Sequence, residues 1–241
     1  MSTRSNHRND PAFVLDVADL VPGLDPRDAD DERDHHAAAL AALPERYRSA
    51  APSHDLVNHW VRAVLGQAAK NVKQARNSDG TWSPMLPKLG QGPSVLLAGT
   101  VGVGKTWQAY GALRALSLSG VWCRPWAYGT APDLYADMRP ASGNNVEAEF
   151  QRLATARVLV LDDLGAGRYT EWAEDVTYRL VNHRYENRMP TMFTTNLENL
   201  TDMADVLGER VASRVMGMVR SAVLTGEDRR ASEHDDLWDA A

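Results

Sequence analysis

The segment GTVGVGKT, residues 99–106, constrains the fold of this 241-residue chain more than any other feature. It matches the pattern G-x-x-x-x-G-K-[ST] and lies between an apolar run, SVLLA, and a helical stretch that begins at Lys105. The pattern requires this context, because the amides of the loop and the N-terminus of the following helix together face the phosphates. The segment therefore predicts a P-loop domain that binds a nucleoside triphosphate.

The residue types in this loop predict individual contacts. Its glycines let the backbone curl so that successive amides point at the phosphates, as in ATP. Lys105 is expected to reach the β- and γ-phosphates, and the Thr106 hydroxyl to bind Mg²⁺. We expect the nucleotide to be bound by Gly99, Thr100, Val101, Gly102, Val103, Gly104, Lys105, Thr106 and Trp107.

Apolar runs alternate with amphipathic stretches after this loop, which favours a three-layer α/β domain around a mostly parallel sheet. Five strands are expected, over residues 94–99, 121–127, 157–162, 190–195 and 219–225. Helices are expected over residues 105–119, 146–155 and 171–187, with an earlier helix over 55–74. The glycine- and proline-rich residues 77–93 are expected to form a loop.

Polar residues end two of these apolar runs. Asp162 and Asp163 follow one strand, and a buried strand can carry two carboxylates only at its tip. In P-loop enzymes the first of the pair holds Mg²⁺ and the second orients or deprotonates the attacking water. Asn196 lies near the end of the run PTMFTTNL and is expected to contact the γ-phosphate or the water from a neighbouring strand. These residues favour hydrolysis over binding alone.

Arginines near the C-terminal end are candidates for transition-state contacts. Arg210 and Arg214 lie on one face of a short helical stretch, LGERVASRVMG. An arginine supplied by a neighbouring subunit can neutralise charge on the transferred phosphoryl group, although a solvated arginine face has the same pattern. Arg229 and Arg230, after the last strand, are candidates for contacting the nucleotide of their own chain.

Composition narrows the cellular setting. A single cysteine, Cys123, excludes an internal disulfide and a zinc quartet, and the chain lacks an apolar run of about 20 residues and a signal peptide. We therefore expect a soluble, cytoplasmic protein without membrane contact. The net charge is −6, but residues 1–44 hold nine acidic and four basic residues, so the rest is nearly neutral. The total charge does not exclude nucleic-acid binding.

Basic and aromatic residues occur together at two places. Residues 70–88 contain four basic side chains near Trp82, and a long segment follows the second expected strand. Single-stranded DNA binding needs basic groups beside stacking rings, although a solvated helix end and a surface loop explain both places equally well. In the second segment these groups are Tyr128, Tyr135 and Arg139.

The motifs GTVGVGKT, VLVLDDLG, TMFTTNL, LGERVASRVM and GEDRR together resemble the AAA+ ATPases of the DnaC/DnaI/IstB group, over about residues 44–231. This group comprises replicative helicase loaders and transposition helper ATPases. The resemblance implies a sheet of order 5-1-4-3-2 in an oligomeric ATPase. Position by position, it implies that Lys105 and Thr106 form the Walker A pair and that Asp162 and Asp163 form the Walker B pair. It also implies that Asn196 is a sensor, Arg214 the arginine finger and Arg230 a second sensor.

The sequence also departs from this group. Loaders usually carry a separate helicase-binding domain before the ATPase domain, whereas residues 1–43 here are acidic and partly disordered in composition. The apolar residues 13–21 are a candidate for folding onto a partner. Asp163 stands where many such ATPases have glutamate, and its shorter reach suggests slow hydrolysis. Residues 232–241 are expected to form a flexible tail.

The sequence as a whole favours an ATPase that loads or regulates a replicative DNA helicase on single-stranded DNA and that assembles through its arginine-finger interface. One alternative is a transposition helper ATPase that acts on double-stranded DNA. Another is a nucleotide-dependent module that bridges partners with negligible turnover.

Overall fold

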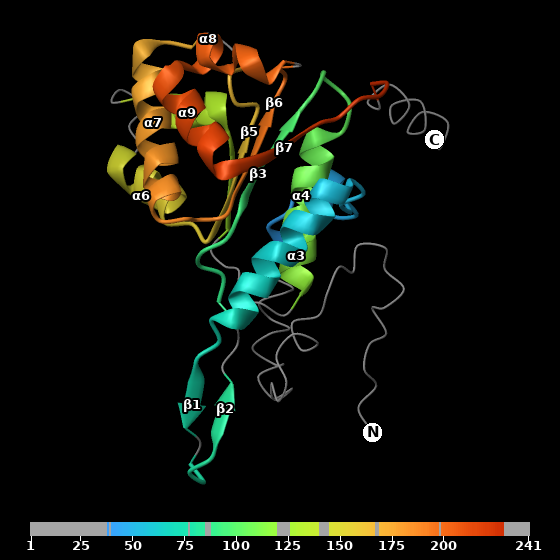
Figure 1. Ribbon diagram of the computed structural model, residues 1–241, viewed down its shortest axis with the longest axis vertical. Coiled ribbons are helices and arrows are strands. Elements are labelled where there is room, and N and C mark those ends of the chain that lie inside the picture. Colours follow the sequence, from blue (N-terminus) through green and yellow to red (C-terminus); the bar gives the residue numbers. More distant parts are fainter. Residues whose placement is uncertain are drawn as a thin grey trace. The chain divides into compact units, whose positions relative to one another are not determined.

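The computed structural model describes residues 38, 40–76, 78–84, 88–119, 126–139, 145–166, 169–197 and 199–228. The chain forms two compact units (Figure 1). The first comprises residues up to 92 together with 107–126, and the second comprises 93–106 together with the residues from 127 onward. None of the helices within the described ranges is long and apolar enough to cross a membrane.

The first unit contains helix α3 (Asp55–Lys70), which follows the 3-10 helix η3 (Glu45–Tyr47), and most of helix α4 (Lys105–Leu118). Apolar residues recur along one face of α3 and are buried there: Val57, Trp60, Val61, Val64, Leu65 and Ala68. Gln108 of α4 joins the two helices. Its Oε1 accepts from the amides of Ser53 and His54 at 2.9 and 3.1 Å, and its Nε2 donates to the Ser53 hydroxyl at 2.7 Å.

The first unit corrects two expectations from the sequence. The helix expected over 55–74 ends at Lys70, and its last expected residue begins strand β1 (Gln74–Arg76). This strand forms an antiparallel hairpin with β2 (Trp82–Pro84), which lies in the segment expected to be a loop. At its turn, Asp79 accepts from the amide and the hydroxyl of Thr81 at 2.9 and 2.6 Å. Three-residue polar strands carry no apolar alternation, so their sequence has the composition of a loop.

The second unit contains a five-stranded sheet with the order β4-β5-β6-β3-β7. Its strands are β3 (Ser94–Ala98), β4 (Trp126–Thr130), β5 (Val158–Asp162), β6 (Thr191–Thr195) and β7 (Val219–Val223). The pairings β3 with β6, β3 with β7 and β5 with β6 are parallel. Numbered along the chain, the order is 2-3-4-1-5, which is 5-1-4-3-2 read from the other edge. The expected fold class is therefore confirmed.

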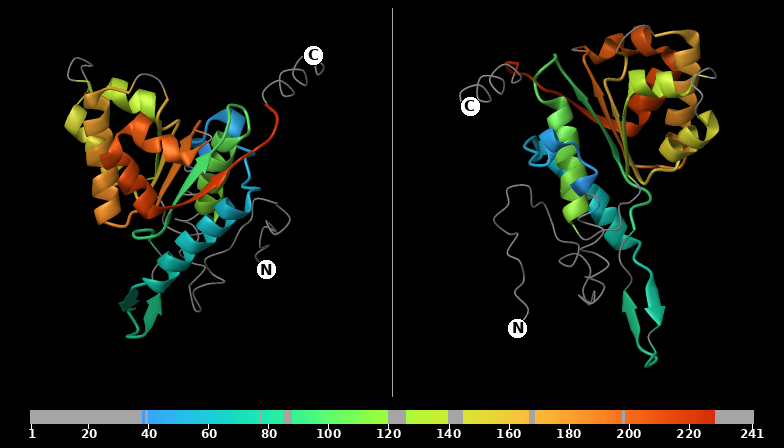
Figure 2. Two further views of the ribbon diagram at one scale, coloured as in Figure 1. Left: turned by 45° about the horizontal axis from the view of Figure 1, so that its top comes forward. Right: turned by 180° about the vertical axis from the view of Figure 1, so that it is seen from behind.

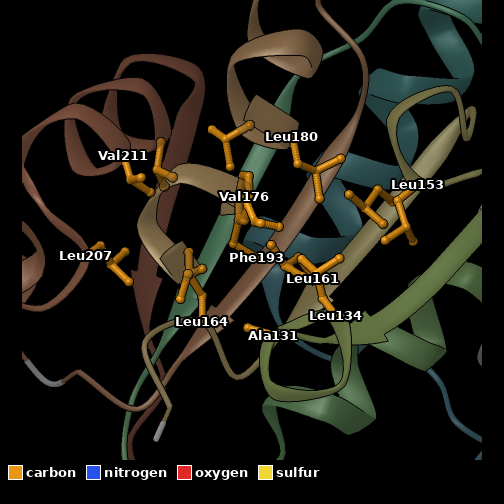
Figure 3. Packing of buried hydrophobic residues seen from close by; sticks show 14 of the residues in the cluster. Ala131, Leu134, Leu153, Leu161, Leu164, Val176, Leu180, Phe193, Leu207 and Val211 are labelled. Carbon is orange, nitrogen blue, oxygen red and sulfur yellow. The ribbon is translucent and has the colours of Figure 1, made fainter. Parts of the chain in front are cut away.

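The three inner strands are buried along their whole length, and apolar residues dominate β3 and β5, whereas β6 also buries three threonines. Helices α6 (Val146–Ala154), α7 (Glu171–Glu186) and α9 (Glu209–Met218) gather on one face of the sheet (Figures 1 and 2). Alternate strand residues such as Leu161 and Phe193 point into this core (Figure 3). They pack there against Leu153, Val176, Leu180 and Val211.

Two boundaries in the second unit differ from the sequence expectation. The strand expected over 121–127 is found at Trp126–Thr130, and residues 121–125 lie outside the described residues. The segment after it contains a helix, α5 (Ala131–Asp137), which was expected to be loop. Thr130 caps α5, because its side chain accepts from the amide of Asp133 at 3.2 Å. The 3-10 helix η5 (Leu200–Asp202) and α8 (Met203–Leu207) then lead into α9.

Candidate nucleotide-binding site

The P-loop connects β3 to α4 and is closed by the residues that follow β7. Gly99 and Gly102 have positive φ angles of 138° and 84°. An added Cβ at Gly99 would collide with the carbonyl oxygen of Leu224, and one at Gly102 with the side chain of Asp228. The Leu224 amide also donates to the carbonyl of Ala98 at 2.8 Å. Both positions therefore require glycine, and residues 224–228 lie directly against the loop.

Lys105 lies inside the curve of this loop. Its side chain is 5% exposed, and its Nζ donates to the carbonyl oxygens of Gly99 and Thr100 at 2.8 and 2.7 Å. The ammonium group is thus held over the backbone that the motif assigns to the phosphates. Val103 is also buried, whereas Val101 is exposed.

Asp162, the last residue of β5, joins the P-loop to two neighbouring strands. Its carboxylate is 2% exposed, and its Oδ2 accepts from the Thr106 hydroxyl at 2.9 Å and from the Tyr128 hydroxyl at 2.5 Å. Its Oδ1 accepts from the Thr194 hydroxyl. Three hydroxyl donors from α4, β4 and β6 therefore orient one buried carboxylate.

These oxygens fit a Mg²⁺ site of the P-loop type. Such sites hold the ion through one threonine hydroxyl and one carboxylate, with phosphate oxygens and water completing the octahedron. Thr106 and Asp162 place this pair within hydrogen-bond distance. Within the described ranges, no cluster of three or more His, Cys, Asp or Glu side chains that could hold a metal ion is found.

Asp163 follows in a left-handed backbone conformation, with φ of 55°. Its amide donates to the Thr194 hydroxyl at 2.9 Å, and the next amide, of Leu164, donates to the Thr194 carbonyl at 2.8 Å. The Nδ2 of Asn196 lies 3.5 Å from Asp163 Oδ1. The structure therefore brings the two expected hydrolytic residues together at the carboxyl ends of β5 and β6.

Arg214 lies elsewhere in the second unit, on α9. Its Nε donates to Asn182 Oδ1 at 3.0 Å, and its guanidinium carbon lies 5.3 Å from the ring centroid of Tyr185, so both partners belong to α7. Arg210 stacks on Tyr178 of the same helix, 3.9 Å from its ring centroid. The structure does not place Arg214 in contact with the P-loop or the Asp162 carboxylate of its own chain.

Two other expected contacts of the nucleotide have separate outcomes. Trp107 belongs to the first unit, where its ring meets the Tyr47 ring edge-on at 6.3 Å between centroids. Arg229 and Arg230 lie outside the described residues.

Sequence reasoning missed the partners of Asp162 and misassigned two tyrosines. Tyr128 and Tyr135 were candidates for stacking on DNA bases, but the Tyr128 hydroxyl donates to Asp162. Tyr135 is 8% exposed and pairs with the Thr177 hydroxyl at 2.8 Å, and burial raises the pKa of its phenol. Arg139 stays exposed, 6.0 Å from the Trp172 ring. Both hydroxyls that join Thr106 at Asp162 come from the strands that flank β5, Tyr128 from β4 and Thr194 from β6.

A P-loop, an Asp-Asp strand end and a 2-3-4-1-5 sheet define an ATP-binding domain of the AAA+ class. The chain belongs to the family of IstB-like ATP binding proteins, whose family model matches residues 90–217. The resemblance inferred from the motifs is therefore confirmed.

Individual curated proteins are also similar to this chain in sequence. The replicative helicase loader DnaI of Bacillus subtilis (strain 168) is 25% identical over 154 residues, which cover 58% of this chain and 49% of the relative. The chain spans about half or less of the length of the curated relatives that it matches.

Among solved structures, the DnaC helicase loader is similar with a TM-score of 0.56 and 24% identity, over 76% of this chain and all of that chain. DnaI is similar with a TM-score of 0.53 and 20% identity, over 82% of this chain and 93% of that chain. At these identities the two structures show a common fold.

Proposed function

We propose that this chain is a helicase-loader-type ATPase that hydrolyses ATP slowly and loads or regulates a replicative DNA helicase on single-stranded DNA. One observation carries the ATPase part of the proposal, namely that Lys105, Thr106 and Asp162 are assembled around the P-loop with Asp163 adjacent. The relationship to the loader DnaI supports the helicase as partner.

In this proposal each residue has a separate task. Lys105 binds the β- and γ-phosphates, and Thr106 with Asp162 holds Mg²⁺. Bound there, the ion would neutralise charge that develops on the transferred phosphoryl group. Asp163 orients the attacking water, and Asn196, 3.5 Å from it, positions the γ-phosphate or the same water. The short side chain of Asp163 supports slow turnover.

Arg214 is assigned to the nucleotide of a neighbouring subunit in a homo-oligomer. Asn182 holds its Nε, and within the described part of the chain its two terminal nitrogens make no hydrogen bond. The Tyr185 ring, 40% exposed, supports the guanidinium from one side. Arg214 is half-buried, and these contacts fix its side chain while its terminal nitrogens keep donors to offer, which a finger supplied in trans requires.

We also assign the chain's parts. Residues 44–231 form the ATPase domain, which includes the matched residues 90–217. Residues 1–43 recruit the partner, and residues 232–241, which lie outside the described residues, are not part of this domain. In this scheme Arg230 contacts the nucleotide in cis, as a second sensor.

A loading assay tests the proposal. The chain is mixed with the replicative helicase of its source organism and a single-stranded DNA circle, and helicase retained on the DNA is measured with ATP and Mg²⁺, without nucleotide, and with Asp163→Asn. We expect the parental chain and ATP to increase retention. If retention is the same without the chain, the helicase-loading function is wrong.

A second candidate is a transposition helper ATPase on double-stranded DNA, which the IstB-like family match favours. Binding to duplex DNA and to a transposase, with none to the helicase, would select it. A bridging module without turnover would retain helicase but release no phosphate.

A further inference from the structure

The β1–β2 hairpin of the first unit takes no part in the proposed nucleotide site. It extends beyond the C-terminal end of α3 in every view (Figures 1 and 2). Trp82, at the start of β2, is 62% exposed, more than any other large hydrophobic residue described. A two-stranded hairpin with three-residue strands is marginally stable alone. The exposed indole is therefore open to a contact outside the chain.

Strand register places a cation beside this ring. Arg76 pairs directly with Trp82, so the two side chains leave the hairpin on the same face, with Cβ atoms about 5 Å apart. The Arg76 side chain is exposed, and its Nη2 lies 3.8 Å from where a Cβ of Gly80 would stand, over the turn. No ion pair involves Arg76 among the described residues. An aromatic face and a guanidinium are therefore presented together.

The charge around the hairpin has the opposite sign to that of the whole chain. Residues 70–92 contain Lys70, Lys73, Arg76 and Lys88 against one acidic residue, Asp79, whereas the net charge of the chain is −6. All four basic side chains are exposed. The surface of the hairpin is thus locally basic and suited to a polyanion.

We propose that the hairpin face formed by Arg76 and Trp82 binds single-stranded nucleic acid, with a base stacked on the Trp82 indole and phosphates paired with Arg76 and Lys73. This proposal rests on the proposed function, because it identifies the surface that binds the single-stranded DNA named there. Duplex DNA hides its base faces in the stack, which leaves only single strands able to stack on the ring.

A protein partner fits this face less well. A hot spot for a protein is normally set in a well-packed apolar surround. The residues around Trp82 are polar or small: Gln74, Thr81, Ser83 and Pro84.

Fluorescence anisotropy with a labelled oligo-dT strand tests the surface, using the full chain and a duplex of equal length for comparison. Trp82→Ala is expected to weaken oligo-dT binding roughly 5- to 100-fold, whereas Trp82→Phe keeps most of the affinity because it keeps a ring. Arg76→Gln is expected to lower the slope of log K against log salt by about 0.7, the value for one single-strand phosphate contact. Arg62→Gln, an exposed residue of α3, removes the same charge away from the hairpin and is the matched control.

The outcomes separate this surface from the proposed function. If the parental chain binds oligo-dT and neither hairpin variant changes the affinity or the salt slope, this assignment is wrong and the proposed function stands. If the parental chain does not bind oligo-dT, both this assignment and the proposed action on single-stranded DNA are wrong. If Trp82→Ala loses helicase binding but keeps oligo-dT affinity, the hairpin is a protein-docking surface instead.

Discussion

Arg184 is the largest fully buried side chain of the described residues, and it has no carboxylate partner. Its Nε donates to the Thr191 hydroxyl at 2.8 Å, and its Nη2 donates to the carbonyl of Pro190 at 2.8 Å. Its Nη1 donates to the carbonyls of Leu153, Ala154 and Ala156 at 3.0, 3.2 and 2.8 Å. One guanidinium thus ties the end of α6 and the chain entering β5 to the start of β6.

The change Arg184→Met keeps the aliphatic stem and removes every donor. Burial lowers the pKa of Arg184 to about 9, so the group is still charged at pH 7, and its loss also relieves the cost of a buried charge. Each buried carbonyl left without a partner costs about 1–3 kcal/mol. We expect a net loss of about 3–5 kcal/mol from the free energy of unfolding, because the cost of several unpaired carbonyls exceeds what is regained by no longer burying the charge.

Urea unfolding followed by circular dichroism measures this loss. With a slope of about 2 kcal/mol per molar urea, the midpoint should fall by roughly 2 M. Arg184→Lys offers three donors from a single point, so we expect no rescue. Arg62→Met, at an exposed site, should stay within about 0.5 kcal/mol of the parent. A loss under about 1 kcal/mol for Arg184→Met, or full rescue by lysine, would refute this reasoning.

Three further predictions concern the site and the termini. Tyr128→Phe removes one donor that orients the Asp162 carboxylate, so Mg²⁺-dependent ATP affinity should fall about 10-fold or more while affinity without Mg²⁺ is unchanged; an unchanged Mg²⁺ titration would contradict the orienting role. Mixing Arg214→Ala with Lys105→Ala should raise phosphate release above the sum of the two variants, because the first chain keeps an intact P-loop and the second keeps its arginine finger. Phosphate release equal to that sum would show that Arg214 does not act on a neighbouring subunit's nucleotide. A chain starting at Ala42 should bind ATP normally but lose helicase in a pull-down, and full retention would contradict recruitment by residues 1–43.

The sheet was predictable from the sequence because its inner strands are buried on both sides of the ladder. Such strands are rich in apolar residues, and the polar residues at the carboxyl ends of two of them, Asp162 and Asn196, mark one edge of the sheet. Strand order came from the resemblance of the motifs to a family, and the observed pairings agree with it.

Two features that could not be predicted from the sequence depend on contacts between residues far apart in the chain. Arg184 has the sequence context of a surface arginine in a charged helix, and only its acceptors 28–31 residues away show that it is buried. Tyr128 shows no sign in its own segment that its hydroxyl binds Asp162, 34 residues later. The hairpin was missed for a local reason, since its strands are too short for an alternating pattern to develop.

Direct ATP binding, measured by isothermal titration calorimetry with Mg²⁺, tests the central claim that residues 99–106 and Asp162 form the nucleotide site. The parental chain should bind one ATP per subunit, and Asp163→Asn should bind with similar affinity because Thr106 and Asp162 remain. Lys105→Ala should show no measurable binding, since the triphosphate loses its main side-chain cation. If Lys105→Ala bound ATP with the parental affinity, the nucleotide site would have to lie elsewhere in the chain.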